Sequence, residues 1–190
     1  MRTVQPDREG RFRALYADTH ADVLRFARRR VHPSHAEDVV ADAFLVAWRR
    51  LEEAPPSSGD ARAWLFGIAR NCLLNTARGL GRQDALAVRI AEITRPAEAG
   101  APEDDAAVQR LDLAAAWRQL NAGEQETLAL TVFEGLTSPQ AARVLGITAA
   151  SYRLRLLRAR RALRRHLERA EPGPEGSLAA LGLDTMENRS

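Results

Sequence analysis

The segment 136–165 constrains the fold most, because it combines a short helix, a glycine turn and a long arginine-rich helix. Ser138 can cap the first helix, with Pro139 at its first helical position, where a missing backbone N–H costs nothing. Gly146 can supply the left-handed residue that ends this helix, and Thr148 can cap the next one. This order of elements predicts a helix-turn-helix, a motif that places its second helix in the major groove of DNA.

The predicted second helix separates its apolar residues from its basic ones. An apolar stripe recurs at spacings of four, three and four residues and comprises Tyr152, Leu156, Ala159 and Leu163. Arginines that can contact phosphates or guanine edges cover the other faces: Arg153, Arg155, Arg158, Arg160, Arg161, Arg164 and Arg165. An amphipathic helix whose arginines only keep a surface soluble is the alternative. The caps, the turn and the stripe together favour the helix-turn-helix.

The composition indicates packed helices and gives no support to catalysis. Of the 190 residues, 45% are hydrophobic and only 5% are aromatic, so we expect an all-helical protein. The formal net charge is only +3, yet the basic residues concentrate late in the chain, so separate charged patches can serve different partners. The sequence has no nucleophile elbow, phosphate-binding loop or metal-ligand motif. We therefore expect neither an enzyme nor a cofactor or metal site.

The cysteine content and the hydropathy indicate a cellular location. Cys72 is the only cysteine and cannot form an internal disulfide. The sequence shows no long apolar run and no signal-like N-terminus. We expect a cytoplasmic protein with no direct membrane insertion.

The chain divides into four parts. A helical block at 9–79 is followed by a linker at 80–106, a second helical block at 107–170 and a tail at 171–190. The linker combines Gly, Pro, Ala and acidic residues with little sustained periodicity, as flexible connections do. The tail opens with EPGPEGS, which stops a helix, and we expect it to be mostly disordered.

The second helix of the first block is predicted to carry an acidic surface. Ser34 and Glu37 form a capping-box pattern at its start. Its apolar residues recur at helical spacing and comprise Val40, Ala43, Phe44, Ala47 and Leu51. Asp38 and Asp42 lie one turn apart on another face. The helix macrodipole is a sufficient reason for Glu37 near the helix start, whereas Asp42 lies too far into the helix for that explanation.

The last helix of the first block combines a buried side with polar residues that helices rarely favour. Asp60 can cap this helix, and its apolar side comprises Trp64, Leu65, Ile68, Cys72 and Leu73. Asn71 and Asn75 lie one turn apart although asparagine is a poor helix former, which favours a contact with a base edge or an unstacked nucleotide. Simple exposure to solvent is the alternative.

Three motifs, in this order, resemble bacterial sigma-70-family factors of the small extracytoplasmic-function (ECF) type: AEDVVADAFLVAWRRL, AWLFGIARN and LTSPQAARVLGITAASYRLRLLRARRAL. The resemblance covers about residues 9–168. It implies an all-α fold of two small helical bundles, sigma region 2 at 9–79 and sigma region 4 with its helix-turn-helix at 107–170, joined by a flexible linker. It also implies a non-enzymatic factor that binds core RNA polymerase, directs it to specific promoters and promotes DNA opening.

The resemblance further implies roles for particular residues. Asp38 and Asp42 match acids that face the β′ clamp helices of the polymerase, and region 4 is expected to meet the β flap. The residues implied to bind the minus-10 element are Trp64, Arg70, Asn71, Asn75 and Arg78. Those implied to bind the minus-35 element are Ser151, Arg153, Leu154, Arg155 and Arg158.

Several positions depart from the family pattern. Tyr152 stands where a small β-branched residue is usual, Leu154 where serine is usual, and Gln140 where glutamate is usual. The loop that precedes Asp60 lacks the aromatic residue that relatives often place there. Leu154 lies off the apolar stripe, where it either contacts a thymine methyl group or packs against a neighbouring helix.

A stand-alone helix-turn-helix regulator is the main alternative to a sigma factor. Such a regulator needs neither the acidic surface nor the AWLFGIARN helix, and it binds duplex DNA tightly without polymerase. An adaptor that only binds another protein leaves the placement of the arginines unexplained. The resemblance also implies an anti-sigma factor that covers the polymerase-facing or DNA-facing surfaces of both bundles.

Overall fold

In a computed structural model of the chain, residues 7–79, 88 and 104–170 are described, and every regular element among them is helical. The expected all-α fold is confirmed. The elements are α1 (Arg8–Arg28), α2 (Pro33–Arg49), the short 3-10 helix η1 (Leu51–Glu53), α3 (Ser58–Gly79), α4 (Asp104–Arg118), α5 (Ala122–Val132), α6 (Ser138–Leu145) and α7 (Ala149–Ala170). Within the described parts, no helix is both long enough and apolar enough to span a membrane.

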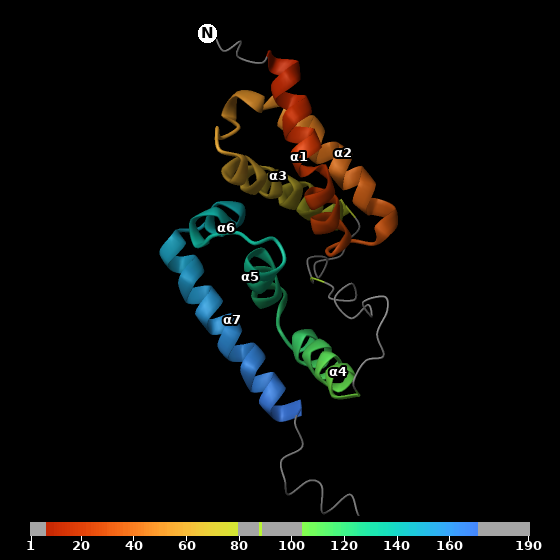
Figure 1. Cartoon of the computed structure of the whole chain (residues 1–190), viewed down its shortest axis with the longest axis vertical. Helices are drawn as coiled ribbons and strands as arrows, with labels where there is room; N and C mark the ends of the chain where they lie inside the picture. Colours follow the sequence, from red (N-terminus) through yellow and green to blue (C-terminus); the bar gives the residue numbers. More distant parts are fainter. Residues whose placement is uncertain (1–6, 80–87, 89–103, 171–190) are drawn as a thin grey trace, which may run out of the picture.

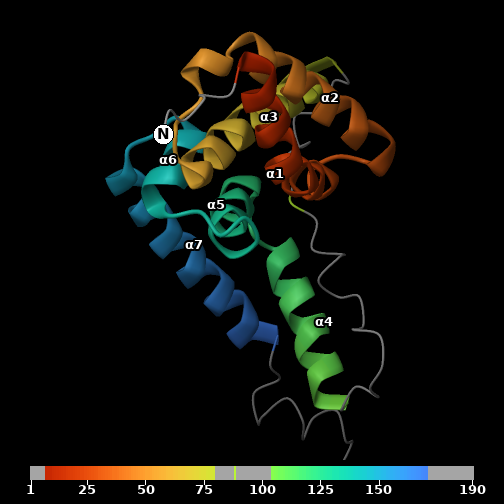
Figure 2. The same cartoon turned by 45° about the horizontal axis from the view of Figure 1, so that its top comes forward.

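The helices form two groups that contact each other (Figure 1). Helices α1, α2 and α3 pack pairwise, and α7 packs on α4, α5 and α6. Helix α6 also packs along α3, which joins the two groups. Figure 2 shows α5 and α6 close to α1–α3, whereas α4 and the end of α7 point away from them. The proposed linker and tail lie outside the described residues, apart from Val88 and the start of α4.

Val88 is held against the second group of helices. It is buried, its backbone N–H donates to Gln125 Oε1 at 3.0 Å, and its carbonyl accepts from Trp117 Nε1 at 2.8 Å. The Gln125 amide also donates to the carbonyls of Trp117 and Leu120, at 3.0 and 3.1 Å. Since Gln125 and Trp117 belong to α5 and α4, this one residue of the expected flexible linker has a fixed position on those helices.

Two of the N-caps expected in the first group are wrong, one by two residues and the other by three. Helix α2 begins at Pro33 after the N-cap His32, whose Nδ1 accepts the Ser34 N–H at 3.4 Å. Proline has a preset φ and no N–H, so it takes the first helical position and excludes a cap at Ser34. Helix α3 begins at Ser58, and Ser57 Oγ accepts the Asp60 N–H at 3.2 Å. The Asp60 carboxylate is therefore free for another contact.

The helix-turn-helix is present, but the N-cap of its first helix lies one residue before the predicted position. The N-cap of α6 is Thr137, not Ser138, and its N–H donates to Gln140 Oε1 at 3.0 Å. A glutamine three residues after a threonine N-cap completes a capping box, so Gln140 can serve where relatives have glutamate. Gly146 ends α6 with φ 67° and ψ 34°, as expected for a left-handed cap. Thr148 Oγ1 accepts the Ser151 N–H at 3.1 Å and caps α7 as predicted.

The apolar stripe of α7 faces the other helices of its group. Tyr152, Leu156 and Ala159 are buried as predicted, and Leu163 is half-buried. Tyr152, which departs from the family pattern, is completely buried, and its hydroxyl donates to the Thr127 carbonyl at 2.8 Å. The same hydroxyl lies 2.7 Å from Thr131 Oγ1. The large side chain therefore fits because α5 offers polar partners to its hydroxyl.

Tyr152→Phe is expected to lower the free energy of unfolding by about 1–3 kcal/mol, because it leaves buried polar groups of α5 without their partner. The midpoint and slope of urea denaturation measure this change. The control is Tyr16→Phe, since Tyr16 is 43% exposed. Equal midpoints for the Tyr152→Phe variant and the unmodified protein would contradict the role assigned to this hydroxyl.

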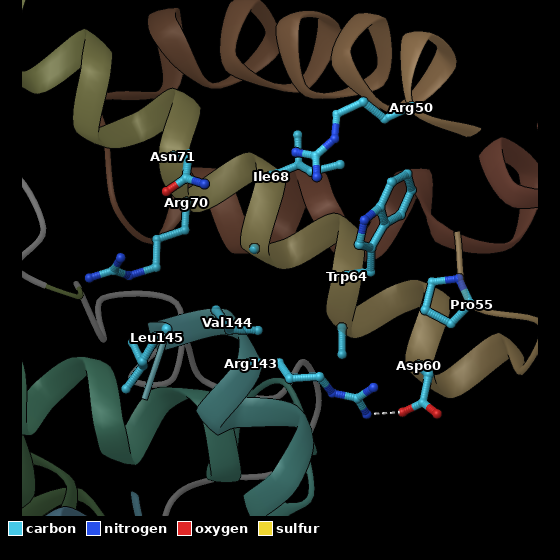
Figure 3. A pocket seen from close by; sticks show the side chains of 13 residues that line it. Arg50, Pro55, Asp60, Trp64, Ile68, Arg70, Asn71, Arg143, Val144 and Leu145 are labelled. Atoms are coloured by element: carbon cyan, nitrogen blue, oxygen red, sulfur yellow. Dashed lines mark hydrogen bonds and ion pairs between the residues drawn. The ribbon is translucent and has the colours of Figure 1, made fainter. Parts of the chain in front are cut away.

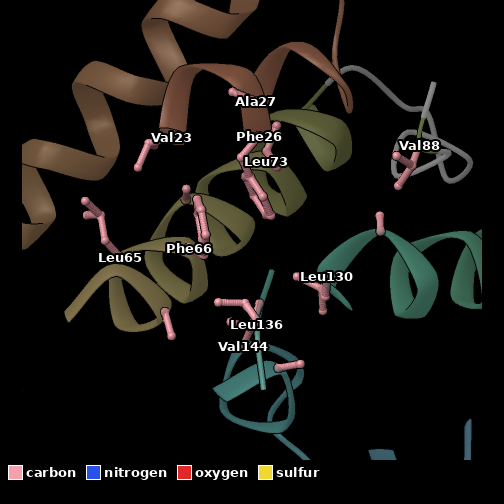
Figure 4. Packing of buried hydrophobic residues seen from close by; sticks show 14 of the residues in the cluster. Val23, Phe26, Ala27, Leu65, Phe66, Leu73, Val88, Leu130, Leu136 and Val144 are labelled. Carbon is pink, nitrogen blue, oxygen red and sulfur yellow. The ribbon is translucent and has the colours of Figure 1, made fainter. Parts of the chain in front are cut away.

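One continuous hydrophobic core joins the two groups of helices (Figure 4). From α3 it includes Leu65 and Phe66, and from the second group Leu130, Leu136 and Val144, all of them buried. Helices α3 and α6 approach closely at Gly67, where a Cβ would lie in ordinary van der Waals contact, 3.8 Å from Val144 Cα. The two groups are thus packed as one body in this structure.

Candidate nucleic-acid and polymerase interfaces

The outer face of α7 presents uncovered cations. Ser151, Arg153, Leu154, Arg155 and Arg158, which were predicted to bind the minus-35 element, are all exposed. In the described part of the chain, none of the arginines at positions 153–165 forms an ion pair. Guanidinium groups without acidic partners can bind phosphates or the guanine edge without first breaking a contact. The buried stripe and the capped turn orient them outward.

Leu154 is 48% exposed, and none of the described helices covers it. Of the two alternatives for this residue, packing against a neighbouring helix is not realised in this structure. Leu157, between Arg155 and Arg158, is also 46% exposed. The exposed face of α7 therefore combines cations with apolar side chains of the kind that contact thymine methyl groups.

The polar residues predicted on α3 divide into two sets. Asn71, Asn75 and Arg78 are exposed on successive turns. Trp64 and Arg70 are half-buried and, together with the exposed Asn71, line a cavity of about 320 Å³ between α3 and α6 (Figure 3). Arg50, Pro55 and Asp60 border the same cavity, and its far wall is formed by residues 143–146 of the helix-turn-helix. The structure thus places these five residues along one helix and brings three of them, Trp64, Arg70 and Asn71, to this cavity.

The acidic surface of α2 is open to solvent. Asp38 and Asp42 are exposed, and neither forms an ion pair with any described residue. The residues predicted to form its apolar side are all buried: Val40, Ala43, Phe44 and Ala47 in α2, and Leu51 at the start of η1. Leu45 lies three residues after Asp42 and is 55% exposed. The surface therefore offers two carboxylates next to an apolar side chain.

A second hollow, of about 670 Å³, lies between α1 and α2 beside this acidic surface. Its lining is mostly aromatic and includes Phe12, Tyr16, Phe44 and Trp48. The rings contact one another, with centroids 4.7 Å apart for Tyr16 and Phe44 and 5.1 Å apart for Phe12 and Trp48. Sequence analysis did not identify this hollow, because periodicity does not show which rings of two helices meet, and Tyr16 within it is 43% exposed.

A cluster of buried charges between the two groups of helices also escaped sequence analysis. Arg30, at the end of α1, is completely buried; its Nε donates to Glu126 Oε2 at 2.9 Å and its Nη1 to Glu134 Oε1 at 3.2 Å. Arg29 Nη1 donates to Glu134 Oε2 at 3.3 Å, and Arg70 Nε lies 3.8 Å from Glu126 Oε1. Burial raises the pKa of the Glu134 carboxyl, and the charges of Arg30 and Arg29 oppose that shift.

Arg62 and Asp60 of α3 each form a further contact with the second group of helices. Arg62 Nη1 donates to Asp22 at 2.8 Å, and its Nη2 donates to the Glu134 carbonyl at 2.6 Å. The Asp60 carboxylate accepts from the Gln140 amide at 3.1 Å and from the Arg143 guanidinium. Hydrogen bonds from Gln140, Ser57 and Arg143 hold the pKa of Asp60 below its ordinary value. Asp60, expected to be a helix cap, is in fact part of the contact with α6.

The described residues show no arrangement typical of a metal site. No group of three or more His, Cys, Asp or Glu side chains among them is close enough to hold a metal ion. Cys72 is a free, half-buried thiol, and burial raises its pKa.

Comparisons with known proteins identify the two groups of helices. Residues 15–83 match the family described as Sigma-70 region 2, and residues 110–163 match the family described as Sigma-70, region 4. The chain is 36% identical over 158 residues to the ECF RNA polymerase sigma factor SigL of Mycobacterium tuberculosis, a match that covers 82% of this chain and 88% of SigL. It is 33% identical over 134 residues to the RNA polymerase sigma factor CnrH of Cupriavidus metallidurans, covering 65% and 69% of the two chains.

Solved structures of similar fold are sigma factors as well. CnrH in complex with the cytosolic domain of CnrY superposes with a TM-score of 0.55 at 29% identity, covering 83% of this chain and 87% of CnrH. The sigma factor RpoE in complex with the anti-sigma factor NepR from Bartonella quintana superposes with a TM-score of 0.53 at 28% identity, covering 83% and 92%. The chain therefore belongs to the ECF group of sigma-70-family RNA polymerase sigma factors, which direct the polymerase to specific promoters.

Proposed function

We propose that three surfaces of this sigma factor divide the work of initiation: α2 binds core polymerase, α3 holds the minus-10 element and α7 reads the minus-35 element. The observation that carries this division is that one chain has an uncovered acidic surface on α2 and an uncovered set of arginines on α7. Opposite charges on separate faces of one chain favour two different partners, a basic protein surface and DNA. The factor brings the partners together and performs no chemistry of its own.

Asp38 and Asp42 are the proposed contacts for the β′ clamp helices. They are exposed and lie one turn apart, so both can meet the same basic partner helix. Leu45 extends this surface with an apolar side chain that is 55% exposed. Charges at the rim guide association, and a central apolar contact contributes affinity. Region 4 is proposed to meet the β flap.

Helix α3 is proposed to hold the unstacked minus-10 strand. Asn71 and Asn75 expose amide groups that can donate to and accept from base edges, and Arg78 adds a cation on the next turn. Trp64 and Arg70 supply an aromatic face and a guanidinium plane at the cavity. Extruding a base costs a few kcal/mol, which stacking on such groups offsets. The loop before Asp60 has no aromatic residue, so Trp64 is the proposed stacking surface.

Helix α7 is proposed to lie in the major groove of the minus-35 element. Its first three turns expose Ser151, Arg153, Leu154, Arg155 and Arg158, and the N-terminal residues of a recognition helix supply the base contacts in this motif.

Arg153→Ala is expected to weaken promoter binding by the complex of sigma factor and polymerase by about 1–3 kcal/mol if Arg153 contacts a guanine edge. A phosphate contact would instead reduce the slope of log affinity against log salt by about 1. Filter binding or fluorescence anisotropy over a series of salt concentrations measures both quantities. Arg164→Ala, an exposed arginine near the other end of α7, is the matched control. Equal losses for the two variants would argue against a recognition role for the first turns.

We also propose a cytoplasmic protein with an anti-sigma partner. RpoE was solved with its anti-sigma factor NepR, and CnrH with the cytosolic domain of CnrY. The exposed acidic surface of α2 and the exposed arginines of α7 are the faces that such a partner would cover.

Run-off transcription on fragmented genomic DNA tests the proposed function directly. The purified chain with bacterial core polymerase should produce discrete transcripts that are absent with core polymerase alone. The chain alone should bind the same DNA fragments weakly. If no transcripts form, while the chain alone binds duplex DNA tightly and in a salt-sensitive way, the protein acts as a stand-alone regulator and the proposed division of surfaces is wrong.

A further inference from the structure

The outermost line of α7 is apolar along its first three turns. It comprises Ala150, Leu154 and Leu157, which are all exposed, and we call it the apolar strip. At about 100° per residue, these side chains point almost directly away from the buried stripe that begins at Tyr152. Neither leucine is among the described residues that form the hydrophobic core or pack against it. The middle of the exposed face is therefore open to an apolar contact from outside the described chain.

Arginines flank the apolar strip on both sides. Arg153 and Arg158 each lie about 70° around the helix from the middle of the strip, in opposite directions. Neither forms an ion pair with any described residue. Cations on either side of an apolar strip match a major groove, where phosphates line both walls and base edges form the floor. A protein partner would instead need acids opposite these arginines, so the charge of the face favours DNA.

The rotation of α7 about its own axis is fixed by its contacts with α5. The Tyr152 hydroxyl donates to the Thr127 carbonyl at 2.8 Å and lies 2.7 Å from Thr131 Oγ1. Leu154 follows Tyr152 by two residues and so points in a direction about 160° away from it. The hydrogen bonds that hold Tyr152 inward therefore also hold Leu154 outward, which gives the apolar strip a defined direction.

We propose, building on the function proposed above, that the apolar strip of α7 contacts the 5-methyl groups of thymines in the minus-35 element and so selects its sequence. Thymine is the base that presents a methyl group in the major groove, and apolar side chains contact it there. Leu154 and Leu157 are one turn apart, which separates their Cβ atoms by about 5–6 Å. Successive base pairs are about 3.4 Å apart, so the two leucines can contact thymines one or two pairs from each other.

The flanking arginines have a different part in this proposal. Arg153 and Arg158 bind phosphates on the two sides of the groove, because the apolar strip lies between them and the base edges. Phosphate contacts fix the orientation of a recognition helix but select no base. Sequence preference thus depends on the leucines, and overall affinity depends on the arginines.

Replacing single thymines of the minus-35 element by deoxyuridine tests this proposal, because it removes the methyl group and leaves base pairing unchanged. The templates are the promoters found by the run-off assay, and competition binding measures the affinity of the full chain in complex with core polymerase. At one or more positions, uracil should weaken binding about fourfold, which corresponds to about 0.8 kcal/mol for one buried carbon group. Equal affinity for thymine and uracil at every position would overturn the proposal, as would a minus-35 element without thymine on either strand.

Variants of α7 show whether the leucines make the methyl contact. In Leu154→Ala with Leu157→Ala, the preference for thymine over uracil should disappear, because the shorter side chains do not reach the groove floor. Both leucines are exposed, so their replacement leaves the core intact. Arg153→Ala is the matched control on the same helix: it should weaken binding to both templates by the same factor and keep the preference. A thymine preference that persists in the double leucine variant would contradict the proposal.

The assays separate this proposal from the proposed function. If the unmodified chain gives no promoter-specific transcripts, the function proposed above is wrong and the reading of thymine is wrong with it. If transcripts form but uracil has no effect, only the reading of thymine is wrong. If the double leucine variant instead loses affinity for core polymerase, the apolar strip is a protein-binding surface and the proposal is again wrong.

Discussion

Reversing both acids of α2, Asp38→Arg with Asp42→Arg, is expected to abolish promoter-specific transcription while the protein stays folded. The two carboxylates are exposed and form no ion pair among the described residues, so their replacement breaks no contact within those parts of the chain. Two arginines facing a basic partner helix replace attraction by repulsion, and such like-charge contacts cost several kcal/mol. A loss of about 3 kcal/mol corresponds to a roughly hundredfold weaker affinity for core polymerase.

Two measurements on the same preparation check this expectation. Binding of a fluorescently labelled chain to core polymerase gives the affinity, and the run-off assay gives the transcripts. Glu9→Arg with Glu168→Arg is the matched control, because it makes an equal change of charge at exposed positions outside the proposed surface. Unaltered affinity in the α2 variant, with a normal denaturation curve, would move the polymerase contact away from Asp38 and Asp42.

Phe66→Ala is expected to lower the free energy of unfolding by about 3–5 kcal/mol, the range for removing a buried phenylalanine. Phe66 is completely buried, and its ring stacks on Phe26 with centroids 4.9 Å apart and an interplanar angle of 20°. Arg62 lies over the Phe66 ring at 5.4 Å from its centroid. Alanine removes these contacts at the point where α1 and α3 meet. Since native proteins are stable by about 5–15 kcal/mol, this single change removes a large part of the total.

Urea denaturation followed by tryptophan fluorescence measures the effect, with Trp48 and Trp64 in the first group of helices and Trp117 in the second. Leu45→Ala is the control for stability, since Leu45 is an apolar residue of the same group but is 55% exposed, and a change within about 0.5 kcal/mol is expected. A similar small change for Phe66→Ala would show that the core around Phe26 rearranges to fill the space.

The sequence alone predicted the helix-turn-helix and which faces of α2 and α7 are exposed. The Tyr152 stripe, the Gly146 turn and the Thr148 cap all depend on residues within one or two turns of each other, so the local pattern predicts them. The exposure of Asp38, Asp42 and the arginines of α7 follows from the same periodicity, because these residues lie opposite apolar stripes. The caps of α2, α3 and α6 differ from the predicted residues, since neighbouring polar residues compete for the same N–H groups.

Only the tertiary structure decided which polar residues meet between the two groups of helices. Arg30 and Glu134 are 104 residues apart, and each is an ordinary surface residue by sequence until the segments that follow α1 and α5 meet. Asp60 has the pattern of a helix cap, yet Ser57 takes that place and Asp60 binds α6, 80 residues further along. Periodicity reports which face of a helix is apolar, but not which helix covers it or which charges are buried in the process. Those outcomes depend on packing between distant segments, where burial and pairing of charge are decided together.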